Sequence, residues 1–425
     1  MPNYNRTKFA CFSAYLTMAS AFCLPPILFT TFHEMYGISY TLLGTLVLIN
    51  FCTQLCIDLL FTFFSRYFNI KWTIRLMPVL TSVGMALYAL SPLLFRENPF
   101  IGLALATVIY SVSAGLSEVL ISPIVAACPS DNPEKDMSFL HGLYGWGVVF
   151  VVLSSSLILR LVGNENWTYL VLFFAVLPLI TAAWFCLSPL PPMDNASATA
   201  ADARKAPGRA AGFALCAVCI FLGGCSESLM TNWISNYMEV ALNVPKAVGD
   251  IAGMAVFALL LASARTLYSR FGKNIQKTLF LSMLLSAVCY LTAGLVQNVI
   301  FAFAACILTG FCSGMLWPGT LIMMEENIPA PGVAIYALMA AAGDLGGSLA
   351  PQMMGVVTDK VAASGFAARM CERLSLTPDA VGLKAGMVIG AVFPLCGIFV
   401  VMLCMRQFRK RGAVQKGQNE KATER

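Results

Sequence analysis

Long apolar stretches, separated by short polar or Gly/Pro breaks, run along almost the whole chain. About twelve of them approach twenty residues, the length that a helix needs to cross the hydrocarbon core of a bilayer. Because backbone polar groups in lipid must be satisfied within the segment, these stretches predict transmembrane helices and an all-α membrane protein. The expected spans are 9–32, 40–64, 72–95, 98–127, 137–161, 167–188, 209–238, 246–269, 275–296, 298–324, 330–357 and 383–406.

The twelve expected spans fall into two similar sets of six. Ser65-Arg66-Tyr67 follows the second span and Ser269-Arg270-Phe271 follows the eighth, which indicates a duplicated six-helix unit. Parallel repeats of this kind place a substrate site at their interface, near the bilayer midplane. The expected division is an N-terminal half at 1–188, a flexible cytoplasmic linker at 189–208, a C-terminal half at 209–406 and a basic cytoplasmic tail at 407–425.

Composition excludes a soluble protein, since 58% of the residues are hydrophobic and only 11% are charged, whereas about a quarter are charged in a soluble domain. Most Lys and Arg lie on the side of both termini, which predicts cytoplasmic termini in the plasma (inner) membrane. The net charge of +6 suits a membrane surface better than nucleic acid. No P-loop, HExxH or paired CxxC pattern occurs, so we expect no enzyme activity, cofactor or metal. The expected partners are a solute, protons and lipid.

Four carboxylates lie inside the expected spans: Asp58, Glu118, Glu227 and Asp344. Each would be costly at a lipid face, so together they mark the protein interior or an aqueous path. Glu118 and Glu227 are near the middle of their spans, which makes them the first and second candidates for proton coupling. Asp344 is either a third coupling carboxylate or the buried partner of Arg265. Asp58, near the cytoplasmic end of its span, fits a structural or gating role better than proton transfer.

Polar and aromatic residues near these carboxylates predict a site for a small polar solute. Amides both donate and accept hydrogen bonds, and an aromatic ring can pack on the apolar face of a sugar. Each residue has an alternative role in helix packing or in the aromatic belt at the membrane interface. The candidates for solute binding are Gln54, Tyr144, Trp146, Asn232, Trp233, Trp317 and Gln352.

Arg270-Phe271-Gly272-Lys273 matches the end of the loop signature G-x-x-x-D-R-x-G-R-R of the major facilitator superfamily, with Ser269 at the usual acidic position. The match is poorer in the first half, where Phe68 and Asn69 follow Arg66. The chain resembles that superfamily over nearly its whole length, which implies two six-helix halves, alternating access and a monomer. The resemblance also implies that Arg66, Arg270 and Gly272 take part in gating, to which we add Asp58 and Arg265.

Glu118 with Pro123 resembles the fourth-helix motif E-x-x-A-N-P of fucose-proton symporter-like carriers, with Ile121 and Ser122 at the Ala and Asn positions. This resemblance implies that Glu118 binds the proton or contacts the sugar. The first span, however, has no acidic residue where that symporter carries an Asp.

The sequence therefore predicts a secondary active transporter that couples protons to the uptake of a small polar solute, such as a monosaccharide. The fifth span lacks the Gly-x-x-x-Gly-Pro-x-x-Gly-Gly pattern of drug-proton antiporters, which favours uptake. Three alternatives stay open: proton-coupled efflux of amphipathic compounds, sodium coupling, and a sensor that does not transport.

Overall fold

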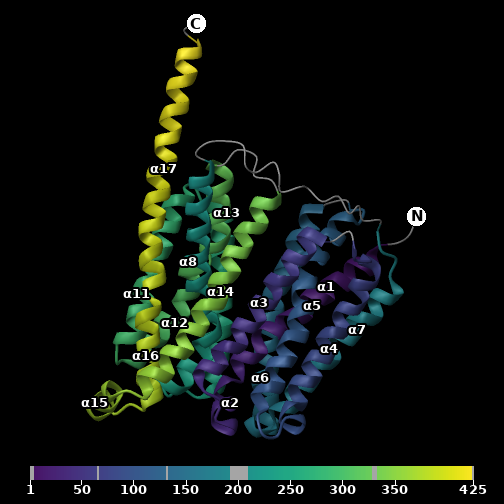
Figure 1. Cartoon of the computed structure of the whole chain (residues 1–425), viewed down its shortest axis with the longest axis vertical. Helices are drawn as coiled ribbons and strands as arrows, with labels where there is room; N and C mark the ends of the chain where they lie inside the picture. The colour runs from purple at the N-terminus through teal and green to yellow at the C-terminus, as the bar shows by residue number, and fades with distance from the viewer. Residues whose placement is uncertain (1–3, 65–66, 131–132, 192–208, 328–332, 424–425) are drawn as a thin grey trace. The chain divides into compact units, whose positions relative to one another are not determined.

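The computed structural model describes residues 4–64, 67–130, 133–191, 209–327 and 333–423. Arg66 and most of the expected linker lie outside these residues. The described chain is almost entirely helical (Figure 1). The helices before the linker are α1 (Asn5–Ile27), α2 (Phe29–Tyr36), α3 (Tyr40–Phe64), α4 (Ile70–Leu94), α5 (Pro99–Ala127), α6 (Pro133–Val162) and α7 (Trp167–Leu187), with a 3₁₀ turn η2 (Asn164–Asn166) before α7.

The helices after the linker include two π-helical segments, η4 and η5. The elements are α8 (Arg209–Asn236), η4 (Tyr237–Ala241), α9 (Lys246–Val248), η5 (Gly249–Ala255), α10 (Val256–Phe271), α11 (Ile275–Leu295), α12 (Val299–Ser313), α13 (Leu316–Asn327), α14 (Val333–Ala362), α15 (Gly365–Leu374), α16 (Pro378–Gly390) and α17 (Val392–Thr423).

These helices confirm the predicted all-α membrane fold. Within the described residues, 11 helical stretches are long and apolar enough to cross a bilayer. The 30-residue helix α14 occupies the position of the remaining expected span. α15 was not expected; it has only 10 residues, too few to cross a bilayer, and begins where the Ser364 hydroxyl accepts a hydrogen bond from the Ala367 N–H. Its Cys371 is half-buried.

Proline and glycine explain where several helices are interrupted. Pro25 and Pro26 lie in the last turn of α1, where proline interrupts the helical hydrogen bonds, and the first span continues after Leu28 as a separate helix, α2. Gly37, with φ +63°, ends α2 in the left-handed conformation typical of helix C-termini. The tenth span breaks between α12 and α13 at Gly314, four residues before Pro318.

The described chain forms two compact units, and neither is a continuous half of the sequence. Unit 1 contains Met1–Ser197, Thr231–Leu259 and Pro351–Gly386, whereas unit 2 contains Ala198–Met230, Leu260–Ala350 and Met387–Arg425. Boundaries between the units fall inside α8, α10 and α14, so each of these three helices has one end in unit 1 and the other in unit 2. Unit 1 consequently holds contacts between segments that come from both sides of the linker.

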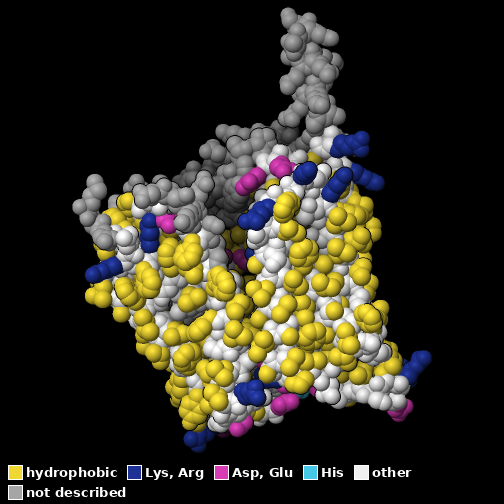
Figure 2. Space-filling model, turned by 180° about the vertical axis from the view of Figure 1, so that it is seen from behind, with side chains coloured by type: hydrophobic (Ala, Val, Ile, Leu, Met, Phe, Trp, Pro, Cys, Tyr) yellow, Lys and Arg dark blue, Asp and Glu magenta, His cyan; other side chains and the backbone are white. Residues whose placement is uncertain are grey.

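In unit 1, α4 packs on α5 and α7, and α1 packs on α6 and α7. In unit 2, α11 packs on α12 and α17. Small residues allow close approach of α8 and α14, because a Cβ atom at Gly346 would meet the Phe221 carbonyl oxygen. Figure 2 shows apolar side chains over the long flanks of the helices and charged side chains gathered toward their ends, as a bilayer requires.

Candidate functional site

Glu118 lies on α5 in unit 1, facing side chains of two other helices. Its charge acts on Asp58 of α3 and on Tyr15 of α1. The Tyr15 hydroxyl lies 3.5 Å from the Ser122 hydroxyl, one turn further along α5. Although Glu118 is in the middle of a span, its side chain is exposed. Glu118 is thus accessible and also close to side chains of α1 and α3. This environment is typical of a carboxylate on a water-filled path rather than in a packed core.

Close packing of α3 on α5 brings Asp58 toward Glu118. Gly115 leaves room for this, since a Cβ atom there would lie 3.0 Å from the Ile57 Cβ and 3.2 Å from the Gln54 Cα. One turn earlier on α3, Asn50 accepts hydrogen bonds from Gln54 Nε2 at 2.9 Å and from the Ser111 hydroxyl at 2.6 Å. This buried polar contact fixes α3 against α5. Gln54, a predicted solute ligand, is therefore also part of the framework of the site.

A second charged group lies in unit 2, where Arg265 of α10 pairs with Glu227 of α8 at 3.4 Å. Arg265 Nε also donates to the Gly314 carbonyl at 2.9 Å. In a continuous helix that carbonyl would accept from residue 318, but Pro318 has no N–H. The guanidinium thus replaces the missing helical hydrogen bond. Arg265 is 43% exposed and Glu227 is 22% exposed, so water can reach the ion pair.

In unit 2, Trp317 of α13 lies against α14, the helix that carries Asp344. Trp317 is half-buried on α13, and its ring lies where a Cβ atom of Gly343 on α14 would be. Asp344, the next residue on α14, is also half-buried. A glycine under the ring lets α13 and α14 approach closely and places the indole next to the Asp344 backbone.

Sequence comparison decides the family. The profile of the Major Facilitator Superfamily matches residues 10–351, which is most of the chain. The protein belongs to the major facilitator superfamily. Comparison with curated protein sequences gives no significant match.

Solved structures of this superfamily share the fold at low sequence identity. A bacterial homolog of the human lysosomal transporter Spinster, inward-facing and occupied, has a TM-score of 0.77 at 14% identity, covering 96% of this chain and 99% of that chain. A D-xylose-proton symporter has a TM-score of 0.72 at 13% identity, covering 92% and 96%. The nucleoside transporter NupG has a TM-score of 0.69 at 13% identity, covering 94% and 98%.

The remaining predicted solute ligands of this superfamily member lie in unit 1 and differ in accessibility. Trp233 is fully buried and its indole N–H donates to the Pro351 carbonyl at 3.0 Å, while Asn232 is 8% exposed. Tyr144 is half-buried, with its ring centroid 6.0 Å from that of Phe22. Their positions range from packed core to half-open surface, so they do not form one continuous lining in this conformation.

Of the two other predicted solute ligands, Trp146 is exposed and Gln352 has a buried side-chain oxygen. Trp146 is 67% exposed and shares an apolar stripe of α6 with Phe150, Leu153 and Leu157, the pattern of a face turned to lipid. Gln352 of α14 has a buried Oε1 atom without a hydrogen-bond partner among the described residues. A buried acceptor of this kind is costly unless water or a ligand donates to it, so Gln352 keeps its place as a candidate ligand.

The predicted gating residues are partly described. Arg270 is exposed at the end of α10, and the Gly272 N–H donates to the Tyr268 carbonyl at 2.7 Å, which ends the helix. Arg66 lies outside the described residues. Asp58, expected in gating, is close enough to Glu118 for their charges to interact.

Sequence reasoning missed Tyr15, Asn50 and Ser111. All three are polar groups within apolar spans, so the cost of leaving them unpaired could have marked them. It also missed His33, Asp359 and Asp379, which meet at one end of unit 1.

Proposed function

We propose that this protein is a proton-coupled transporter that takes up a small polar solute, such as a monosaccharide, by alternating access. Glu118 carries the proposal, because it is an accessible carboxylate in the middle of a membrane span. Its interaction with Asp58 disfavours a state in which both carboxylates are ionised. The pair is thus suited to holding one proton while the carrier changes conformation.

The relatives of known structure support this class of cargo. One is named a D-xylose-proton symporter and another a nucleoside transporter; both names describe small polar solutes. In this chain, the half-buried Trp317 offers a ring that can pack on such a solute, and the buried Gln352 Oε1 atom, which has no hydrogen-bond partner among the described residues, can accept a hydrogen bond from one.

The decisive experiment uses purified protein in liposomes, with sugars, sugar acids and nucleosides screened first by thermal shift, because a bound ligand raises the melting temperature. An inward gradient of about one pH unit can drive about tenfold accumulation per proton, since 1.4 kcal/mol is a factor of ten. We expect Glu118→Gln to abolish this accumulation but to keep solute exchange between equal concentrations. Glu97→Gln, an exposed substitution outside the spans, is the matched control. Normal proton-driven accumulation by Glu118→Gln would refute the proposal.

Efflux of amphipathic compounds is the second candidate. The neighbouring carboxylates Asp58 and Glu118 of unit 1 would attract a cationic compound inside a low-dielectric site. In the same thermal-shift screen, stabilisation by lipophilic cations and not by sugars or nucleosides would favour efflux.

A further inference from the structure

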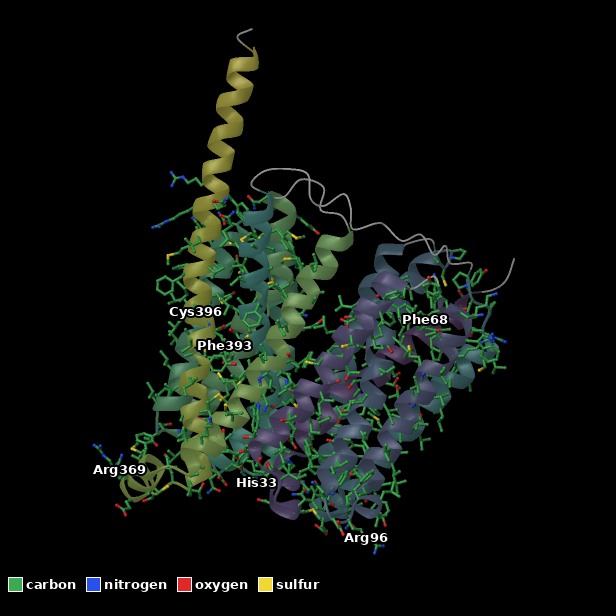
Figure 3. The ribbon with its side chains drawn as sticks, in the orientation of Figure 1. His33, Phe68, Arg96, Arg369, Phe393 and Cys396 are labelled. Carbon is green, nitrogen blue, oxygen red and sulfur yellow. The ribbon has the colours of Figure 1, made fainter. Side chains whose placement is uncertain are left out.

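Segments from both sides of the linker meet at one end of unit 1. They are α2 and the start of α3 from the first part of the chain, and the ends of α8, α14 and α16 from the second. Figure 3 shows His33 of α2 at the same end of this unit as Arg96, which follows α4. Because the distribution of Lys and Arg predicts cytoplasmic termini, this is the outer end of the transport path.

An aspartate from α14 closes this end by capping α3. Asp359 accepts hydrogen bonds from the backbone N–H groups of Tyr40 at 3.0 Å and Thr41 at 2.7 Å. A carboxylate is favourable there because the first N–H groups of a helix lack partners and carry partial positive charge. The two aspartate contacts join residues that are 319 and 318 positions apart. They must break whenever the two sets of helices separate.

More contacts between the same segments surround the cap. Asn236 at the end of α8 donates to the Thr30 hydroxyl of α2 at 2.9 Å. The Trp233 ring lies 5.2 Å from Phe29 and 6.0 Å from Tyr40, measured between centroids. These buried groups shield the cap from water, so the outer end is tightly closed in this conformation.

The hydrogen bonds of His33 determine which ring nitrogen carries a proton. His33 Nδ1 lies 2.9 Å from the Ile38 carbonyl oxygen, which can only accept, so Nδ1 must carry a hydrogen. Nε2 then faces the Asp379 carboxylate of α16 at 3.4 Å. In a neutral ring, Nε2 would present a lone pair to that carboxylate, and the two would repel. The contact is favourable only when a proton lies between them.

We infer that His33 and Asp379 form an outer proton-binding site, distinct from the carboxylates within the spans, whose occupation holds the outer end of the transporter closed. A proton from the outer solution completes the Nε2–H to carboxylate hydrogen bond. Separation of α2 from α16 removes that bond and releases the proton. The inference goes beyond the proposed coupling and does not depend on Glu118 or on the identity of the solute.

The aspartates around His33 favour its cationic form, since Asp359 of α14 acts on it in addition to Asp379. The Tyr40 ring stacks on His33 with centroids 4.3 Å apart, and Glu34 is the next residue on α2. The hydrogen bond to Asp379 raises the pKa of His33, with help from the Ile38 carbonyl and against the opposing effect of burial.

The sign of the pH dependence follows from this raised pKa. The closed end gains its full stability below the ordinary His pKa of about 6.5 and loses it as pH rises through the pKa that His33 has when closed. Two other charged residues lie at this end of unit 1. Glu239 of η4 and Lys246 of α9 pair with each other at 3.4 Å, separately from His33 and Asp379.

Hydrogen exchange tests the inference directly, using the full chain in lipid nanodiscs without solute. The measured quantity is the protection of the Tyr40 and Thr41 amides at about pH 5.5 and about pH 8.5, on either side of the ordinary His pKa, corrected for the intrinsic exchange rate. We expect protection in the wild type to fall several-fold at the higher pH. Protection that stays constant would overturn the proposal.

Three variants separate proton binding from mere packing. His33→Gln cannot titrate, so the protection should no longer depend on pH. Asp379→Asn can donate its amide to neutral Nε2 and accept from the protonated ring, so protection should stay high at both pH values. His141→Gln removes the other histidine of the chain and should behave as the wild type. If Asp379→Asn or His33→Gln kept the wild-type pH dependence, the site would be excluded.

Discussion

Asn50 is the residue on which the packing of α3 against α5 depends most clearly. Its Oδ1 atom accepts from both Gln54 and Ser111. Asn50→Ala would therefore leave the buried Ser111 hydroxyl without this acceptor and leave Gln54 Nε2 only its longer contact, 3.4 Å, to the carbonyl of residue 50. In membrane helices such interactions are worth about 1–2 kcal/mol in model systems. We expect Asn50→Ala to lower the free energy of unfolding by about that amount, measured by thermal denaturation in detergent. Asn98→Ala, an exposed position whose side chain caps no helix, should change stability little; equal losses would contradict the assignment.

At the scale of elements, the break between α12 and α13 provides a second prediction. Pro318→Ala would supply the N–H that the Gly314 carbonyl lacks, and the residue-318 N–H would displace Arg265 Nε. We expect the initial rate of transport to fall several-fold, because a straightened span no longer anchors Arg265. Stability should change by less than about 1 kcal/mol, since the carbonyl keeps a partner. Transport into liposomes and thermal denaturation measure the two quantities.

Pro178→Ala in α7 is the matched control for this change. It also removes a proline from a span, and within the described hydrogen bonds no arginine takes the place of the missing N–H there. An equal loss of transport in both variants would show that proline removal itself, and not the release of Arg265, is responsible.

At the scale of the whole molecule, the structure predicts that α14 controls closure of unit 1 at the end where α2 and the start of α3 lie. Asp359→Ala removes both acceptors from the start of α3, and loss of a helix cap costs about 1 kcal/mol, or about fivefold in the closed population. We therefore expect about fivefold lower protection of the Tyr40 and Thr41 amides at acidic pH. Lys360→Gln, at the next and exposed position, should leave protection unchanged. A wild-type exchange rate in Asp359→Ala would exclude the capping role.

Much of this molecule could be predicted from local sequence. Span lengths follow from apolar runs, and the cost of a carboxylate in lipid singled out Glu118 and Glu227 before any contact was known. The hydrogen bond of Arg265 could be predicted only in part. Pro318 indicates that the Gly314 carbonyl lacks its helical donor, but not that Arg265 donates to it. The contacts of Asp359 join positions more than 300 residues apart, and no periodicity within one helix encodes such a pairing. Trp146 shows the same limit, because the pattern of α6 does not reveal which of its faces meets lipid.

The short helix α15 gives the chain a natural reporter of its own orientation. Thirteen of the 15 cysteines fall inside the expected spans, and Cys128 beyond α5 is buried. Cys371 is left as a half-buried thiol on a helix of 10 residues, too short to cross a bilayer. A membrane-impermeant maleimide added to intact cells should therefore label the wild type and not Cys371→Ser. Labelling only after the cells are broken would place α15 in the cytoplasm and contradict the orientation expected from the Lys and Arg distribution. The same thiol could carry a fluorophore, so that one dye reports topology without removing the other cysteines.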